Sequence, residues 1–132
     1  MVKTFNINTR SRSEMIDITG QIRAALKEGR IQSGVCHVFV PHTTAAVTIN
    51  ENADPDVQKD ILSELDKVIP LSDHYRHVEG NSAAHIKSSL VGTSETIFVE
   101  NGDLVLGTWQ SVFFCEFDGP RTRKFIVKFT ES

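Results

Sequence analysis

The sequence predicts an α+β fold in a single compact domain that spans residues 1–132. A length of 132 residues suits one domain with one core. Hydrophobic residues make up 39% of the chain and charged residues 23%, which is ordinary globular usage and unlike that of a disordered chain. Helical and strand-like periodicities occupy separate stretches, which predicts a mixed or antiparallel sheet with helices packed on it.

The chain opens with two strand-like stretches. Residues 3–8 and 15–18 alternate in the manner of strands, and the polar residues 10–13 connect them, which predicts a hairpin. A short helix is expected next, because Thr19 is a good N-cap and Gly29 can end a helix in a left-handed conformation.

The middle of the chain combines strands with the clearest helix signal. Residues 35–40 predict a buried strand, and residues 46–49 resume an extended pattern. Asp54 before Pro55 marks a helix start, because the carboxylate accepts from free N–H groups and proline has none to leave unpaired. This helix should run to about Ile69 and pack its apolar stripe on a sheet.

The last third follows a second short helix, expected between Ser82 and Gly92. It predicts a meander of strands at 96–100, 104–118 and 124–130. Both alternating sets of the middle strand are largely apolar. Either this strand forms a subunit interface, or it bends at Gly107 and is wrapped within one core.

Composition and charge exclude several classes of function. The net charge is -3 and the basic residues are scattered, so no nucleic-acid partner is expected. The apolar runs are far shorter than a membrane span, and the start of the sequence lacks an apolar leader stretch, so we expect a cytoplasmic protein without a membrane partner. Cys36 and Cys115 lie in apolar strand-like runs, as buried thiols do in a reducing compartment.

Five histidines carry the candidate chemistry. His42 lies at a predicted strand end, His77 lies in a polar loop, and His85 lies on the flank of the following helix. Three neutral imidazoles with an open position fit a zinc-like divalent site; the alternative is that the histidines are unconnected. His37 has the opposite parity to His42 along its strand and should lie apart, and His74 is given no role.

Further polar residues could complete such a site. Glu51, Asn81 or Glu116 would orient the histidines or bind a water. Arg121 and Arg123 offer two guanidinium groups at a predicted turn, which suits a phosphate or a carboxylate. The alternative for the arginines is a pair of surface salt bridges.

Three segments resemble the signature blocks of one family. They are residues 42–55, 85–94 and 107–110. In order and spacing these segments resemble those of the YjbQ family of secondary thiamine-phosphate synthases. The resemblance covers nearly the whole chain. It implies an α+β protomer, a homotrimer, and a metal pocket of His42, His77 and His85 near a subunit boundary, holding a divalent ion such as zinc or magnesium.

The resemblance also implies a reaction. Members of the family join hydroxymethylpyrimidine diphosphate to hydroxyethylthiazole phosphate as a secondary activity, which gives thiamine phosphate and pyrophosphate. We therefore expect a small phosphorylated substrate, with His85, Arg121 and Glu51 as the catalytic residues. Two alternatives stay open, a metal-dependent hydrolase of a small substrate and a non-catalytic trimer that binds an anionic metabolite.

Overall fold

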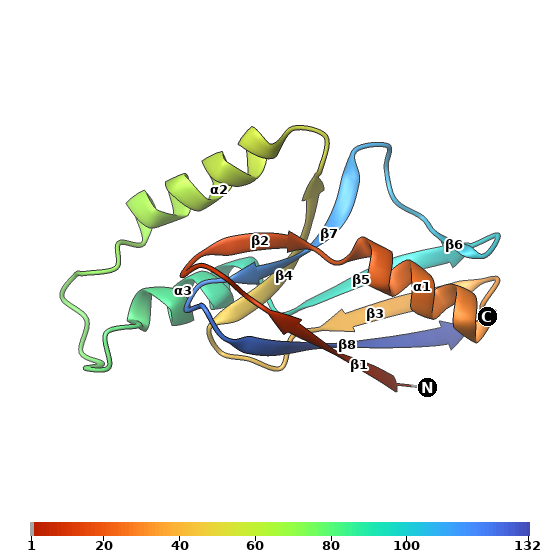
Figure 1. Cartoon of the computed structure of the whole chain (residues 1–132), viewed down its shortest axis with the longest axis horizontal. Coiled ribbons are helices and arrows are strands. Elements are labelled where there is room, and N and C mark those ends of the chain that lie inside the picture. Colours follow the sequence, from red (N-terminus) through yellow and green to blue (C-terminus); the bar gives the residue numbers. More distant parts are fainter. Residues whose placement is uncertain (1) are drawn as a thin grey trace.

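Two antiparallel sheets and three helices make up the computed structural model, which describes residues 2–132 (Figure 1). The predicted α+β class is confirmed. The helices are α1 (Thr19–Gly29), α2 (Pro55–Val68) and α3 (Ser82–Val91). The strands are β1 (Val2–Asn8), β2 (Glu14–Asp17), β3 (Gly34–Phe39), β4 (Ala45–Glu51), β5 (Ser94–Glu100), β6 (Asp103–Leu104), β7 (Gln110–Glu116) and β8 (Thr122–Glu131).

The first sheet has the strand order β1-β8-β3-β5-β6, and the second has the order β2-β7-β4. The predicted opening hairpin is therefore wrong, because β1 pairs with β8 and β2 pairs with β7. The polar residues 10–13 carry the chain from one sheet to the other. Two backbone hydrogen bonds hold this crossing to the turn that precedes β8, from Thr9 N–H to Arg121 O at 2.9 Å and from Gly119 N–H to Arg12 O at 3.0 Å.

The predicted meander is correct only at its start. Asn101 and Gly102 make the expected turn between β5 and β6, both with positive φ, of 51° and 72°. After β6 the chain leaves the first sheet, because residues 105–109 separate it from β7, and β7 pairs with β2 and β4. The following strand, β8, returns to the first sheet between β1 and β3. Apart from the β5–β6 turn, the strands thus pair with partners distant in sequence.

The apolar core lies in two clusters on the two sides of β7. Val112 and Phe114 point into the larger cluster, between the sheets and α1, while Phe113, Cys115 and Phe117 belong to a smaller one under α2 and α3. The chain itself therefore covers both apolar faces of this strand, although with two clusters rather than the one core that the second alternative predicted.

The two cysteines are free and buried, as predicted. Burial raises the pKa of both the Cys36 and the Cys115 thiol to about 12.

The helix boundaries confirm some capping predictions and correct others. The Asp54 carboxylate accepts from the Asp56 N–H at 2.9 Å and caps α2, as predicted. Thr19 does not cap α1, because its hydroxyl oxygen accepts from the Val112 N–H at 2.8 Å and thereby ties the helix to β7. The left-handed residue that ends α1 is Arg30, with φ of 53°, rather than Gly29.

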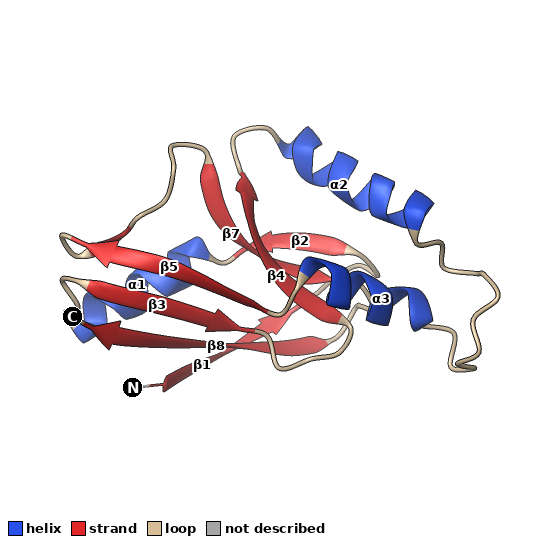
Figure 2. Cartoon of the chain, turned by 180° about the vertical axis from the view of Figure 1, so that it is seen from behind, coloured by secondary structure: helices blue, strands red, loops and turns tan. Residues whose placement is uncertain are grey.

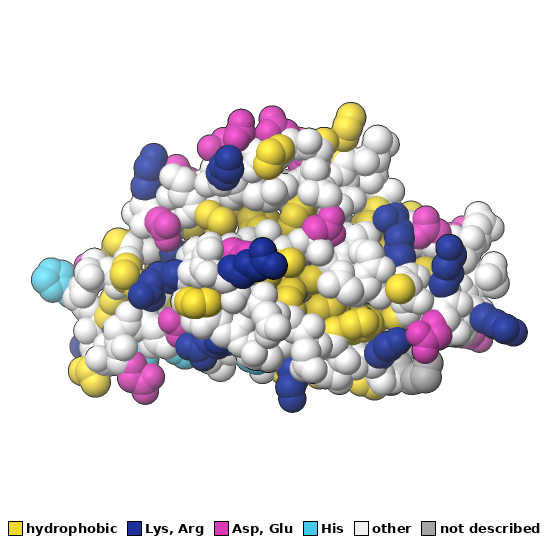
Figure 3. Space-filling view, in the orientation of Figure 1, with side chains coloured by type: hydrophobic (Ala, Val, Ile, Leu, Met, Phe, Trp, Pro, Cys, Tyr) yellow, Lys and Arg dark blue, Asp and Glu magenta, His cyan; other side chains and the backbone are white. Residues whose placement is uncertain are grey.

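Helix α2 is less firmly packed than its apolar stripe predicts. None of its residues is buried, and Leu62 and Leu65 lie half-buried against the smaller cluster. Figure 3 shows apolar side chains in the seam between this helix and the strands beneath it. Among the helices of residues 2–132, none is long and apolar enough to cross a membrane.

The outer face of the first sheet has no helix over it (Figure 2). Cross-strand pairing places Phe39 beside Ile126 and Val35 beside Phe98 on this face. Phe39 and Phe98 are 46% and 65% exposed, which is far more than expected for large apolar side chains in the middle of a sheet. His37 shares this face, as its parity predicted.

Candidate functional site

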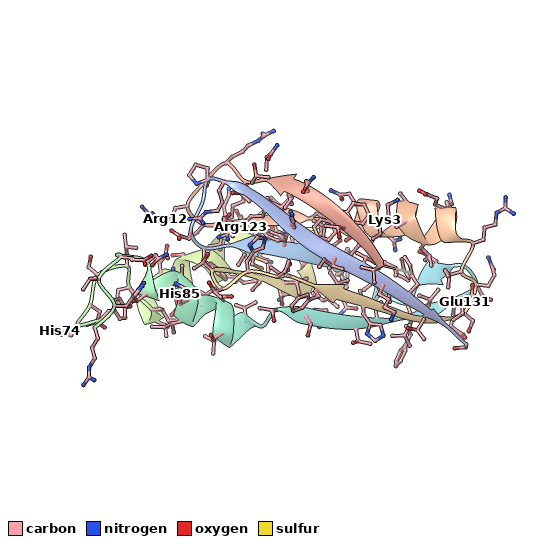
Figure 4. All side chains as sticks on the ribbon, turned by 90° about the horizontal axis from the view of Figure 1, so that it is seen from below. Lys3, Arg12, His74, His85, Arg123 and Glu131 are labelled. Carbon is pink, nitrogen blue, oxygen red and sulfur yellow. The ribbon has the colours of Figure 1, made fainter. Side chains whose placement is uncertain are left out.

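A cleft of about 590 Å³ opens at one end of the molecule, where the two sheets meet. The segment between β3 and β4, the start of α3 and the turn before β8 form its walls. Figure 4 shows Arg123 and His85 at this end, with Lys3 and Glu131 at the opposite end. His42, His85, Arg121 and Arg123 all line the cleft, so the structure brings together four of the residues that the sequence singled out.

A buried ion pair forms the base of the cleft. The guanidinium of Arg123 in β8 donates to both carboxylate oxygens of Glu116 in β7, with 2.9 Å from Nε to Oε1. The two side chains are 3% and 0% exposed. The Thr9 hydroxyl and the Asp118 N–H also donate to Glu116, at 2.8 and 3.0 Å, and Arg123 donates to the hydroxyl oxygen and the carbonyl of Thr44.

These contacts decide the ionisation of Glu116. Burial alone would raise its pKa, but the hydrogen bonds from Arg123, Asp118 and Thr9 outweigh burial and lower the pKa from its ordinary value of 4.5. The carboxylate is therefore charged at neutral pH. The prediction that Arg123 lies at an exposed turn is wrong, because alternation along β8 places it on the same inward face as Phe125 and Val127.

Arg121 remains at the surface of the cleft. Its side chain is 50% exposed, and it donates to the Asp118 carboxylate and carbonyl, each at 3.1 Å. The same carboxylate accepts from the Asn81 amide at 2.8 Å. Asn81 lines the cleft, and its Oδ1 atom is buried without a hydrogen-bond partner among residues 2–132.

His42 is held as a neutral ring. The Lys124 backbone N–H donates to Nε2 at 2.9 Å, so the neutral ring carries its proton on Nδ1. Burial, followed by the nearby Arg123 charge, lowers the pKa of His42 below its ordinary value of 6.5. This histidine can donate a hydrogen bond to a ligand through Nδ1, but it has no free lone pair for a metal while the contact with Lys124 persists.

His77 lies next to His85 but outside the cleft. The two rings make an edge contact with 5.5 Å between centroids, and Nδ1 of His77 lies 3.0 Å from the Ser82 hydroxyl. His77 lines a shallower hollow that it shares with His85. His74 projects from the outer end of the loop before α3, away from the cleft (Figure 4).

The described residues of one protomer do not fit the predicted three-histidine metal site. Within residues 2–132, no group of three or more histidine, cysteine, aspartate or glutamate side chains is close enough to hold a metal ion. His77 and His85 are neighbours, whereas the Nε2 lone pair of His42 is engaged by the backbone. The metal site stays a prediction that needs a rearrangement of His42 or a ligand from another subunit.

Glu51 does not reach the cleft. It ends β4, whereas His42 precedes the start of that strand. At about 3.3 Å per residue, the six steps from Ala45 to Glu51 span about 20 Å. The predicted participation of Glu51 with His85 is therefore not supported within one protomer. Asp118 and the buried Arg123 take a larger part in the cleft than the sequence indicated.

The fold and the cleft together define the class of protein. It is a small α+β protein with two antiparallel sheets, and histidines and arginines line a cleft where the two sheets meet. The chain belongs to the family described as UPF0047 protein YjbQ-like, whose model matches residues 3–132.

Several proteins are similar to this chain over nearly their whole length. This chain is 57% identical to the UPF0047 protein YugU of Bacillus subtilis over 129 residues, which cover 97% of this chain and 98% of the relative. A solved YjbQ/UPF0047 family structure from Clostridium acetobutylicum is 54% identical, with a TM-score of 0.96 over 97% of this chain and 99% of that one. A structure from Aeropyrum pernix K1 is 34% identical, with a TM-score of 0.95, and the match covers 100% of this chain and 99% of that one.

Substitution of Glu116 by Gln tests the buried ion pair. We expect a loss of about 3 kcal/mol in the free energy of unfolding at neutral pH, because Arg123 is then buried without a counter-charge. The measurement is urea denaturation. Glu64→Gln is the matched control, because it breaks the exposed pair with Lys67 and should change stability by less than about 1 kcal/mol.

The same pair predicts a pH dependence with a defined sign. Folding lowers the pKa of Glu116 below its ordinary value of 4.5. The stabilisation that ionised Glu116 gives the folded state is therefore fully present above pH 4.5, and it is lost as the pH falls through the lower pKa of the folded state. The wild type should lose more stability over this range than Glu116→Gln. Equal losses would contradict the assigned ionisation.

The metal prediction is tested by metal analysis of the purified protein. If His42, His77 and His85 hold one divalent ion, His85→Ala should lose it, because three protein ligands leave little redundancy. His74→Ala is the control, since this histidine lies in the same part of the chain but points away (Figure 4). Full metal content in the His85→Ala protein would exclude the three-histidine site.

Proposed function

We propose that the cleft binds a small phosphorylated metabolite and joins hydroxymethylpyrimidine diphosphate to hydroxyethylthiazole phosphate, giving thiamine phosphate and pyrophosphate. The observation that carries the proposal is the convergence of His42, His85 and Arg121 on one cleft. Its volume of about 590 Å³ lies within the usual range for small-molecule sites. The choice of reaction rests on the resemblance of residues 42–55, 85–94 and 107–110 to the YjbQ family of secondary thiamine-phosphate synthases.

The reaction needs positive charge where the diphosphate leaves. The C–O bond between the pyrimidine methylene and the diphosphate breaks, and its electron pair goes to the leaving oxygen. The lone pair of the thiazole nitrogen then forms the new C–N bond, and no proton is gained or lost. Arg121 is the exposed cation of the cleft wall and would hold the diphosphate through guanidinium N–H groups that Asp118 does not use.

The histidines would position the substrates. Neutral His42 can donate from Nδ1 to a ring nitrogen or hydroxyl group, and the unpaired Asn81 Oδ1 can accept from an amino group such as that of the pyrimidine. His85 faces the same space from α3. A site that pairs each polar group of its ligand can discriminate strongly between related substrates.

The charges of the cleft bear on whether the diphosphate binds as a free anion or as a magnesium complex. Arg123 is neutralised by Glu116, which leaves Arg121 with Asp118 and Glu79 among the charged lining residues. A magnesium complex of the diphosphate suits such a wall better than the free anion, because Mg²⁺ is usually held by one or two carboxylates together with substrate phosphates. A resident metal that activates water would need a ligand set that residues 2–132 of one chain do not assemble, so no structural observation favours the hydrolase alternative.

The substitution Arg121→Gln tests the proposed reaction. We expect turnover to fall about a hundredfold, because the lost donors act mainly on the leaving diphosphate. Folding stability should change little, since the side chain is 50% exposed. Product is measured as fluorescent thiochrome with both substrates present, and Arg23→Gln is the control, since Arg23 is similarly exposed and bonds Asp103 outside the cleft.

Two outcomes would contradict this assignment. Equal turnover in the wild type and Arg121→Gln would remove the arginine from the reaction. Saturable binding of hydroxymethylpyrimidine diphosphate without any product from the wild type would instead identify a non-catalytic binding protein.

A homotrimer is part of the proposal. The uncovered apolar face of the first sheet reaches the cleft through Phe39, so a neighbouring subunit on this face would also border the site. We expect a trimeric mass in sedimentation equilibrium and a shift toward monomer in Phe98→Glu. Val68→Glu on α2 is the matched control, since the two side chains are 65% and 66% exposed. A stable monomeric wild type at micromolar concentration would count against this arrangement.

A further inference from the structure

A second cavity of about 550 Å³ lies on the other flank of α3. Residues 11–13 form one wall, the end of α2 forms another, and Phe117 lies between them. It shares no lining residue with the cleft of His42 and Arg121. The two cavities are thus separate, and α3 contributes to both, His85 to the cleft and Lys87 to the second cavity.

Lys87 is a buried charge that is only partly satisfied. Its side chain is 6% exposed, and its ammonium group binds the Asp66 carboxylate and lies 5.9 Å from the centre of the Phe117 ring. An ammonium group has three donors, and within residues 2–132 Asp66 is its hydrogen-bond acceptor. Burying a charged lysine side chain costs free energy unless its donors are paired. The unused donors of Lys87 therefore require a physical explanation.

Arg12 brings a second cation to the same cavity. Its guanidinium makes no hydrogen bond within the described residues, and the nearest carboxylate oxygen, of Asp118, lies 3.9 Å away. The loop beneath it is nevertheless fixed. The Glu14 carboxylate accepts from the Arg10 and Ser11 N–H groups at 2.7 and 3.2 Å.

The neighbouring turn packs tightly against this loop. A Cβ at position 119 would lie 2.3 Å from the Ser11 carbonyl, so only glycine allows the close approach. The backbone of the loop is therefore locked, while the guanidinium that it carries makes a long contact of 3.9 Å with the Asp118 carboxylate, which also pairs with Arg121. Such an arrangement presents a cation at a defined place on the cavity wall.

The cavity differs from the cleft in charge. Its charged lining residues are Arg12, Lys87 and Asp66, which sum to one net positive charge, whereas in the cleft Arg123 is neutralised by Glu116 and Arg121 faces both Asp118 and Glu79. Ser11 and Ser13 also line the cavity, together with the apolar residues Pro70, Leu71, Ala83, Ala84 and Phe117. Two cations, two serines and several apolar residues in one lining match an amphipathic anion.

We propose that this cavity binds a small organic phosphate monoester. Its phosphate contacts the Arg12 guanidinium and the Lys87 ammonium, with the serine hydroxyls as further donors, and its apolar group lies against Leu71 and Phe117. Arginine suits this role because its planar fork matches phosphate oxygens in pairs. The inference does not depend on the proposed reaction, because no residue of the cleft takes part.

The test is a titration of the full chain with phenyl phosphate, followed by the backbone amide resonances. We expect saturable shifts at Arg12, Ser13, Lys87 and Phe117, with weaker binding of inorganic phosphate, which lacks the apolar group, and of benzyl alcohol, which lacks the charge. Shifts confined to the His42 and Arg121 cleft would overturn the proposal, and so would equal affinities for phenyl phosphate and benzyl alcohol.

Two variants separate binding from folding. Arg12→Gln changes a side chain that is 58% exposed and should weaken phenyl phosphate binding about tenfold without altering the fold. Lys87→Met removes the buried charge at similar size and should weaken binding at least as much. Arg23→Gln, an exposed arginine that lines neither cavity, should bind as the wild type does. Undiminished binding by Arg12→Gln would overturn the proposal, whatever the behaviour of Lys87→Met.

Discussion

The buried pair between Glu116 and Arg123 is the interaction on which the arrangement of the molecule depends. Glu116 belongs to the second sheet and Arg123 to the first, so their bidentate contact joins the two sheets at the end that carries the cleft. Thr9, which follows β1, and Thr44, which precedes β4, are hydrogen-bonded to the same pair. Two charges at 0% and 3% exposure are tolerable only because hydrogen bonds satisfy both.

This junction also fixes the chemistry above it. His42 is kept neutral partly by the Arg123 charge, and the Asp118 N–H that donates to Glu116 belongs to the residue that binds Arg121 and Asn81. The polar groups of the cleft are thus fixed by a network whose base is inside the protein. A ligand would meet groups that are already oriented, which reduces the entropy lost on binding.

Local sequence signals predicted the elements better than their pairing. Asp54 and Pro55 define the start of α2 because capping involves only neighbouring atoms. Strand partners are different, since β1 and β8 pair across more than a hundred residues and alternation alone does not say which strands meet. The predicted hairpin failed for this reason, although both of its strands exist.

The candidate site was predictable in its residue types and less so in its geometry. Strand ends and helix flanks correctly indicated His42 and His85 as neighbours of one cleft. The burial of Arg123 could have been found from its alternation with Phe125 and Val127, and that of Glu116 from Phe114 and Val112, since two inward charges require each other. The unpaired Asn81 oxygen depends on three-dimensional packing and left no signal in the sequence.

The loose packing of α2 has a consequence for how the protein opens. A helix without a buried residue can detach from its sheet at a smaller cost in free energy than global unfolding, as sub-global units do in other proteins. Cys115 lies in the cluster that α2 covers, whereas Cys36 lies in the larger core between the sheets. The two thiols therefore report separate events: exposure of Cys115 reports the undocking of one helix, and exposure of Cys36 reports the loss of the whole fold.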